Sequence, residues 1–438
     1  MSGTLPLTIG NFQSLSVLRL TGGKIGGIIP STIGALTTLV TLDIQENSFN
    51  GTIPTTVGAL TSLTSLYLNS NSFTGTIPSG ISVLKSLSRL RISHNYFNGI
   101  IPSSIGAMTN LVVIDFSYNF FNGTIPTTVG ALTSLTSLYL DSNSFTGTIP
   151  SGVSVLKSLY YLGISHNYFN GIIPSSIGAM TNLVVIDFSY NFFNGTIPNT
   201  ISALTSLYHI SLSGNSLSGT IPSTISALTS LTALQIAGNS LIGTIPNTIS
   251  ALTSLYYIYL SGNSLIGTIP STISALTSLT YLLISNNTLY GTIPGSIGVL
   301  THLVGIDLSF NSLTGPIPIS IGALTRLEFI SLSSNSLFGT IPSTMSALTS
   351  LEYVDFGNNY LTMGTATTVP TSTFSSFTLS KNISLSNNCL AFDTVSPYRH
   401  VTATHCRPTS KYQLTVARCN SISYIMIIPI PFSICRHE

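Results

Sequence analysis

Hydrophobic and polar positions along this chain of 438 residues repeat with a period of 24. Within each unit the pattern is Leu-x-x-Leu-x-Leu-x-x-Asn, as in Leu255, Ile258, Leu260 and Asn263. Alternation around the last two apolar residues predicts a short strand whose apolar side chains point inward. The asparagine keeps the period without a register slip, at Asn47, Asn71, Asn95, Asn119, Asn143, Asn167, Asn191, Asn215, Asn239, Asn263, Asn287, Asn311, Asn335 and Asn359. Such a period predicts a solenoid of coils that each pack on their neighbours.

The segment after each asparagine reads Leu-x-Gly-x-Ile-Pro, where glycine suits a bend and proline fixes the start of the returning segment. In that return, Ile273, Leu276 and Leu279 are three residues apart, a spacing that suits a 3₁₀ turn or a short helix. We therefore predict an α/β, β-rich solenoid with a parallel sheet on its concave face and 3₁₀ or short helical segments on its convex face. The asparagine is expected to turn into the core and pair with backbone groups there.

The repeats divide the chain into an array and a C-terminal part. We assign residues 1–361 to about 15 coils, residues 362–410 to a degenerate last coil and a cysteine-containing cap, and residues 411–438 to a tail that could be disordered. Because Gly3, Thr4 and Pro6 already spell the end of a repeat, an N-terminal cap is expected to be absent and the true start to lie upstream.

All four cysteines, Cys389, Cys406, Cys419 and Cys435, follow the last regular repeat. An even number confined to one terminal segment indicates a disulfide-stapled cap in an oxidising compartment. Three pairings are open, of which we favour Cys389 with Cys406. Four unpaired thiols in an intracellular protein are the alternative.

The long consensus Asn-x-Leu-x-Gly-x-Ile-Pro, as at Asn263 to Pro270, resembles the plant-type class of leucine-rich repeats. That class occurs in polygalacturonase-inhibiting proteins and receptor-like kinase ectodomains, and similar repeats occur in surface proteins of some protists. The resemblance covers about four fifths of the chain. It implies a curved, usually extracellular solenoid that binds proteins, peptides or glycans. The family's N-terminal cysteine cap and kinase segment have no counterpart here.

Composition narrows the classes of partner. Only 5% of the residues are charged and the net charge is +2, so nucleic acid and anionic membrane surfaces are disfavoured. The apolar stretch Ile422 to Phe432 is too short to cross a bilayer. Asp115, Asp187, Asp307 and Asp355 share one column but lie in different coils, too far apart for shared acid–base chemistry. No histidine has metal-ligand or triad spacing, so we expect no cofactor, no metal and no enzyme.

Residues 51–122 and 123–194 are near copies that differ at five positions. Three of the five lie in one predicted strand, where Arg89 and Arg91 of the first copy become Tyr161 and Gly163 of the second. Diversification of a binding surface and neutral drift at unconstrained positions explain this equally well. Outward positions also carry Tyr67, Tyr139, Tyr257, Tyr259, Tyr281, Phe329 and Tyr353. We predict ligand binding by Arg89, Arg91, Tyr161, Tyr257, Tyr259, Tyr281 and Tyr353, centred on the cluster of Tyr257, Tyr259 and Tyr281.

The sequence thus favours a non-catalytic, extracellular or cell-surface module that binds a protein or glycan through its concave sheet. The alternative is a structural or ice-adsorbing protein that uses the threonine column of the Gly-Thr-Ile-Pro turns, such as Thr220, Thr244 and Thr268. A thermal-hysteresis assay separates the two. Sequons at Asn50, Asn122, Asn194, Asn286 and Asn382 permit N-glycosylation of a secreted chain. The oligomeric state is not determined by the sequence.

Overall fold

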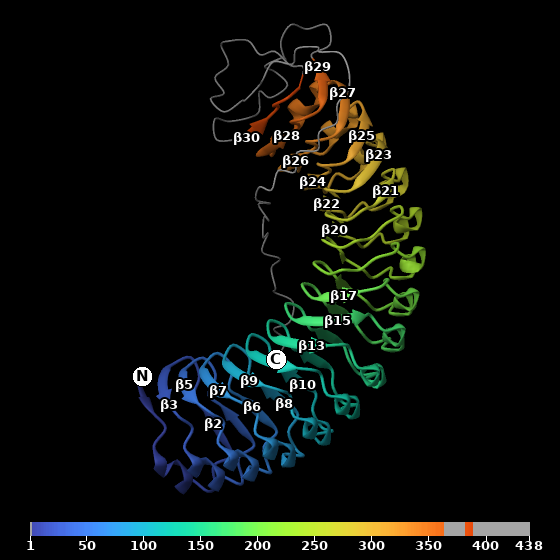
Figure 1. Cartoon of the computed structure of the whole chain (residues 1–438). Helices are drawn as coiled ribbons and strands as arrows, with labels where there is room; N and C mark the ends of the chain where they lie inside the picture. The colour runs from blue at the N-terminus through green and yellow to red at the C-terminus, as the bar shows by residue number, and fades with distance from the viewer. Residues whose placement is uncertain (1, 363–381, 389–438) are drawn as a thin grey trace. The chain divides into compact units, whose positions relative to one another are not determined.

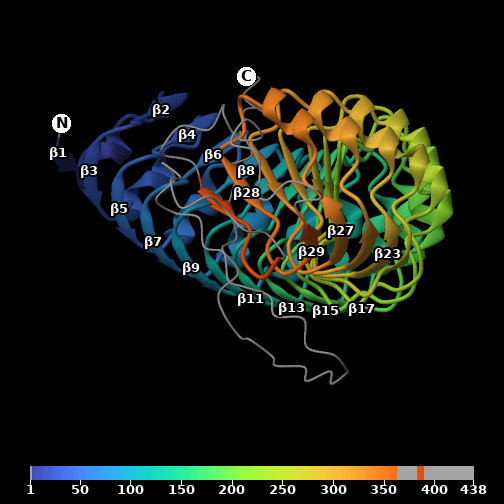
Figure 2. The same ribbon diagram turned by 90° about the horizontal axis from the view of Figure 1, so that it is seen from above.

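The computed structural model describes residues 2–362 and 382–388, which stack as successive coils (Figure 1). Each coil contributes one strand to a 16-stranded parallel sheet on the inner side of the array. A 3₁₀ helix follows on the outer side, and the solenoid predicted from the 24-residue period is confirmed (Figure 2). The predicted cysteine pairing and the 411–438 tail lie outside the described residues.

The inner sheet runs in chain order, and its strands register at steps of 24 residues up to β28. Its strands are β2 (Val17–Arg19), β4 (Thr41–Asp43), β6 (Ser65–Tyr67), β8 (Arg89–Arg91), β10 (Val113–Asp115), β12 (Ser137–Tyr139), β14 (Tyr161–Gly163), β16 (Val185–Asp187), β18 (His209–Ser211), β19 (Ala233–Gln235), β20 (Tyr257–Tyr259), β22 (Tyr281–Leu283), β24 (Gly305–Asp307), β26 (Phe329–Ser331), β28 (Tyr353–Asp355) and β30 (Asn382–Ser384).

A second set of short strands forms where the chain leaves the asparagine, and the sequence did not predict it. These strands make a lateral face beside the inner sheet, as a nine-stranded and a five-stranded parallel sheet (Figure 2). They are β1 (Ser2–Thr4), β3 (Lys24–Gly27), β5 (Ser48–Gly51), β7 (Ser72–Gly75), β9 (Tyr96–Gly99), β11 (Phe120–Gly123), β13 (Ser144–Gly147), β15 (Tyr168–Ile172), β17 (Phe192–Asn194), β21 (Ile266–Gly267), β23 (Thr288–Thr292), β25 (Ser312–Gly315), β27 (Ser336–Thr340) and β29 (Tyr360–Thr362).

The outer side is built from five-residue 3₁₀ helices, each preceded by the repeat proline. Proline suits this position because its fixed φ leads into the turn and its missing N–H would be unpaired there. The helices are η1 (Leu7–Asn11), η2 (Ser31–Ala35), η3 (Thr55–Ala59), η4 (Ser79–Val83), η5 (Ser103–Ala107), η6 (Thr127–Ala131), η7 (Ser151–Val155), η8 (Ser175–Ala179), η9 (Asn199–Ala203), η10 (Ser223–Ala227), η11 (Asn247–Ala251), η12 (Ser271–Ala275), η13 (Gly295–Val299), η14 (Ile319–Ala323) and η15 (Ser343–Ala347).

Apolar columns fill the space between these three faces. Leu255, Ile258, Leu260 and their counterparts are buried in nearly every coil. Behind the lateral strands, phenylalanines stack coil upon coil from Phe49 to Phe193, for example with 6.1 Å between the ring centroids of Phe49 and Phe73. Leucine takes over this column from Leu217 onward. The core is therefore continuous along the array, and no coil buries its apolar side chains without its neighbours.

The repeat asparagine ties each coil to the one before it. Asn191 Nδ2 donates to Ile164 O of the preceding coil at 2.9 Å and to Ser189 O of its own coil at 3.1 Å. Its Oδ1 accepts from the Phe169 N–H at 3.0 Å. The side chain therefore pairs backbone groups that the turn leaves without a partner, as the sequence predicted.

The column of hydrogen-bonded asparagines, which we call the asparagine ladder, extends past the regular repeats into the degenerate coil. Asn388 Oδ1 accepts from the Leu361 N–H at 3.1 Å, and its Nδ2 donates to Phe356 O at 2.8 Å. Ile383 and Leu385 are buried beside it, in strand β30 and just after it. This coil closes on the same bonds as the others, although a longer segment precedes it.

Replacing Asn191 with alanine should lower the free energy of unfolding by about 2–4 kcal/mol, because a buried N–H and several carbonyls lose their partner together. Urea unfolding followed by circular dichroism measures the change. Asn194→Ala is the matched control, since the same residue type lies exposed three residues later and should change stability little. Equal losses of stability in the two variants would contradict the stabilising role of the asparagine ladder.

Candidate ligand-binding surface

Two columns of side chains project from the inner sheet. Strands register residue for residue, so Tyr257 lies between Ala233 and Tyr281, and Tyr259 lies between Gln235 and Leu283. These side chains alternate with the buried leucines and isoleucines of the same strands, as period-two alternation requires. All the sequence-predicted binding residues belong to these two columns.

Aromatic rings lie on four of five adjacent strands near the C-terminal end of the inner sheet. Tyr257 stacks on Tyr281 with 5.6 Å between ring centroids and an interplanar angle of 14°. Phe329 and Tyr353 pack with 5.7 Å between their centroids. Between these pairs stands Gly305, where an ideal Cβ would lie 2.6 Å from Tyr281 Cδ1 and 3.0 Å from Phe329 Cδ1. The rings of Tyr281 and Phe329 therefore both lean over Gly305. We call Tyr257, Tyr281, Phe329 and Tyr353 the aromatic column.

Tyr259 widens the aromatic column on one side. Its ring meets Tyr257 edge to face, with 6.0 Å between centroids. Burial, and then the neighbouring Tyr257 and Tyr281, raise the pKa of Tyr259 to about 12. Burial first, and nearby carboxylates second, also raise the pKa of Tyr281 and of Tyr353. These hydroxyl groups therefore stay protonated near neutral pH and can donate hydrogen bonds to a ligand.

Carboxylates surround the aromatic column. Glu328 and Glu352 are exposed immediately before β26 and β28, and Asp307 and Asp355 project from the second column. Asp307 Oδ1 accepts from the Ser309 N–H at 3.0 Å, and Asp355 Oδ1 accepts from the Gly357 N–H at 3.0 Å. Across residues 2–362 and 382–388, none of these carboxylates forms an ion pair. The surface is thus negatively charged without an internal counter-ion.

Arg89 and Arg91 form a separate, basic part of the inner sheet. Both are exposed, and the Arg91 guanidinium lies 5.8 Å from the centroid of the Tyr67 ring. Strand β8 lies seven strands before β20, which is about 34 Å along the sheet. The structure therefore does not bring the two arginines together with Tyr257, Tyr259 and Tyr281. Tyr353 belongs to the aromatic column.

Tyr161 belongs to a third group, in the second copy of the duplicated segment. Its ring packs on Tyr139 with 4.2 Å between centroids. Asp141, the counterpart of Asn69, lies close by, and its Oδ1 accepts from both the N–H and the hydroxyl of Ser165 at 2.9 Å. Burial, and then the nearby Asp187, raise the pKa of Asp141 to about 7. Gly163 stands where the first copy has Arg91. A side chain at Gly163 would collide with Asp141 and Tyr161, so the glycine makes room for these two side chains.

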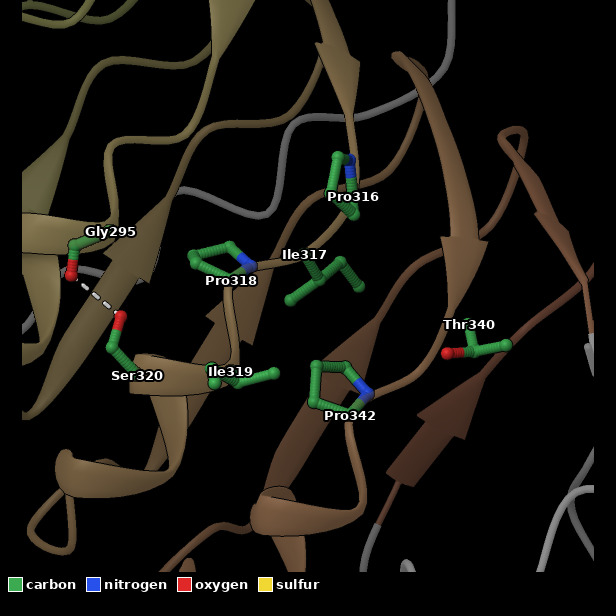
Figure 3. A pocket seen from close by; sticks show the side chains of 8 residues that line it. All are labelled: Gly295, Pro316, Ile317, Pro318, Ile319, Ser320, Thr340 and Pro342. Atoms are coloured by element: carbon green, nitrogen blue, oxygen red, sulfur yellow. Dashed lines mark hydrogen bonds between the residues drawn. The ribbon is translucent and has the colours of Figure 1, made fainter.

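An open depression of about 440 Å³ at the outer edge is lined by Gly295, Pro316, Ile317, Pro318, Ile319, Ser320, Thr340 and Pro342 (Figure 3). None of these side chains titrates. Among the described residues no group of three or more His, Cys, Asp and Glu side chains could hold a metal ion. Nor does any described helix have the length and apolar character that a membrane span requires.

The threonine column considered for ice adsorption is interrupted. Isoleucine replaces threonine at Ile28, Ile100 and Ile172, and Pro316 interrupts the column again. Where present, the threonine methyl group covers the glycine of the next coil, as Thr244 Cγ2 does 2.8 Å from an ideal Cβ on Gly267. This packing gives the threonines a structural reason to recur.

Family models match most of the array. The model described as "Leucine rich repeat" matches residues 13–73, 85–145, 157–217, 207–265 and 229–289. A second model of the same description matches residues 302–324 and 326–348. The chain belongs to the leucine-rich-repeat family. Comparison with curated protein sequences gives no significant match.

Solved structures of plant receptors share the fold of this leucine-rich-repeat protein. The crystal structure of a TDR receptor is 34% identical over 85% of this chain and 64% of that one, with a TM-score of 0.81. The Arabidopsis receptor kinase HAESA, solved with the peptide hormone IDA and the co-receptor SERK1, is 32% identical over 89% and 72%, with a TM-score of 0.78. The plant peptide hormone receptor RGFR1, solved with RGF2, is 33% identical over 88% and 69%, with a TM-score of 0.72. The chain thus spans somewhat under two thirds of the TDR receptor chain, and its repeats are of the plant type.

Asp141→Asn should stabilise the protein at pH 8 by about 1–2 kcal/mol, because the folded chain buries an ionised carboxylate at this pH and a neutral amide avoids that cost. The pKa of Asp141 lies near 7 in the folded chain against an ordinary value of 3.8. Between these values the folded chain holds a proton that the unfolded chain has lost, so the free energy of unfolding falls as pH rises through this window.

Above about pH 7 both states are ionised and this contribution becomes constant. Urea midpoints of the wild type and Asp141→Asn measured from pH 4 to pH 8 test the effect, and the two curves should diverge as pH rises. Asparagine occupies the equivalent position, Asn69, in the first copy, so the variant introduces no foreign residue. A variant that is less stable than the wild type at pH 8 would refute the assignment.

Proposed function

We propose that this leucine-rich-repeat protein is a non-catalytic, extracellular recognition module that binds an extended basic peptide or protein segment on the aromatic column. The observation that carries the proposal is the run of Tyr257, Tyr281, Phe329 and Tyr353 across five adjacent strands of the inner sheet. Exposed or half-buried rings side by side offer large contact area at low cost in side-chain entropy.

The dimensions of the aromatic column suit a peptide. Four strand steps at about 4.8 Å span about 19 Å, which is the length of roughly six residues of an extended chain. The protonated hydroxyl of Tyr259 lies beside the column, where it can donate to peptide carbonyls.

Charge favours a basic ligand over a neutral glycan. Asp307, Glu328, Glu352 and Asp355 surround the column, and the exposed Arg326 just before β26 is the described basic residue nearest to them in the sequence, so acidic groups outnumber basic ones here. A lysine or arginine side chain could contact a ring face and also attract a carboxylate as an ion, whereas a neutral sugar could only donate hydroxyl hydrogen bonds to the carboxylates. The two receptors solved with peptide hormones, RGFR1 and HAESA, provide a precedent for peptide binding by this fold.

Panning a library of random peptides against the immobilised full chain tests the proposal. Basic sequences should be enriched, and their affinity should fall as salt rises because exposed charges are screened. For a selected peptide, the triple variant Tyr257→Ala, Tyr259→Ala, Tyr281→Ala should raise Kd at least thirtyfold, or about 2 kcal/mol, as expected when a recognition centre is removed.

The matched control removes three exposed tyrosines from the lateral strands, as Tyr96→Ala, Tyr168→Ala, Tyr290→Ala, and should leave Kd unchanged. A thermal melt of both triple variants checks that each remains folded. Gly305→Ala adds a methyl group under two rings without removing any, and should weaken binding moderately. Selection of acidic peptides, or equal Kd values for both triple variants, would refute the proposed site.

A further inference from the structure

The lateral face carries two identical pairs of exposed rings. On β9 and β11, Tyr96 and Phe120 stack with 6.1 Å between centroids and an interplanar angle of 12°. Three coils later, on β15 and β17 (Figure 2), Tyr168 and Phe192 stack in the same way, with 6.0 Å between centroids and an interplanar angle of 20°. Each ring is more than half exposed, with Phe120 at 56% and Phe192 at 55%. Exposed adjacent rings of this size call for something to cover them.

Each stack ends at a serine. In the coil after Phe120 the same position is Ser144, and after Phe192 it is Ser216. One side of the Phe120 ring therefore faces Tyr96, while the other side faces the coil that carries Ser144. Serine is much smaller than a ring, so the next coil offers the outer side of each phenylalanine no ring to stack on, and the apolar face of a sugar could cover that side.

An N-glycosylation sequon lies next to each open ring. Phe120, Phe121, Asn122, Gly123 and Thr124 are consecutive, and Phe121 is buried while Phe120 and Asn122 are exposed on the same face of β11. Residues two apart on one face of a strand are about 6.6 Å apart, so a sugar on Asn122 can reach the ring of Phe120. Gly123 then turns the chain with a φ of +72°, which keeps Asn122 at the outer edge of the strand.

We propose that Asn122 and Asn194 are N-glycosylation sites whose first sugar packs on Phe120 and Phe192. In the modification, the amide nitrogen of asparagine forms a bond to C1 of the N-acetylglucosamine at the reducing end of a lipid-linked oligosaccharide. The amide loses a proton and the lipid diphosphate leaves. The apolar face of the sugar bears polarised C–H groups, which the negative face of an aromatic ring attracts. This inference rests on the extracellular location that the proposed function requires.

The chain contains its own control. Asn50, Gly51 and Thr52 form an exposed sequon that is followed by the same residues as Asn122 as far as Leu68. The strand neighbours match as well, because Asn50 pairs with Ser72 and Asn122 pairs with Ser144. The decisive difference lies two residues earlier, where Ser48 stands in place of Phe120. Asn50 therefore has the sequon without the ring.

The experiment secretes the full chain from a eukaryotic host behind a foreign leader peptide and measures glycan at each site by mass spectrometry. Asn122 and Asn194 should be occupied. A peptide N-glycosidase acting on the folded protein should release their glycans about fivefold more slowly than the glycan of Asn50, a factor typical of one ring contact. After denaturation the rates should be equal.

Two exchanges test the role of the ring. Phe120→Ser should raise the native release rate at Asn122 to that of Asn50, and Ser48→Phe should lower the rate at Asn50. An unoccupied Asn122, or equal native release rates in the wild type, would overturn the proposal. The foreign leader makes the result independent of the natural location. Peptide binding is measured on unglycosylated protein, so failure of the proposed function would be recognised separately.

Discussion

The column of buried asparagines is the constraint on which the rest of this structure depends. Each side chain pairs backbone groups of its own coil and of the coil before it, as Asn191 does with Ile164, Phe169 and Ser189. A turn at this point would otherwise bury polar groups without partners, which a core of leucine, isoleucine and phenylalanine cannot tolerate. The 24-residue period is therefore set by backbone hydrogen bonding as well as by apolar packing.

With the inward positions fixed in this way, the outward positions are free to differ between faces. The two copies of the duplicated segment illustrate this. The lateral pairs Tyr96 with Phe120 and Tyr168 with Phe192 are unchanged, whereas on the inner sheet Arg89 and Arg91 have become Tyr161 and Gly163. A lateral face covered by the chain's own glycans and an inner face that varies in charge would confine ligand contacts to the inner sheet.

The inner sheet itself divides into regions of different character. Arg89 and Arg91 are solvent-exposed cations next to Tyr67, whereas the strands from β24 to β28 carry carboxylates around the aromatic column. In between, burial and Asp187 raise the pKa of Asp141 to about 7. A ligand that lies along this sheet would meet a different electrostatic environment at each end, which favours one orientation over its reverse.

The sequence alone determined the coil, its faces and the positions that point outward, because periods of two and 24 residues translate directly into strand alternation and coil stacking. It located Tyr257, Tyr259 and Tyr281 for that reason, and it identified the role of the asparagine. It did not reveal that the rings of Tyr281 and Phe329 both lean over Gly305, or that Asp141 lies against Ser165 and Tyr161. Nor did it reveal the lateral strands, although the segment Phe-Phe-Asn-Gly-Thr at residues 120–124 could have indicated one of them. These features were decided by the tertiary structure, because they depend on contacts between residues of different coils, which the repeat pattern of a single coil does not specify.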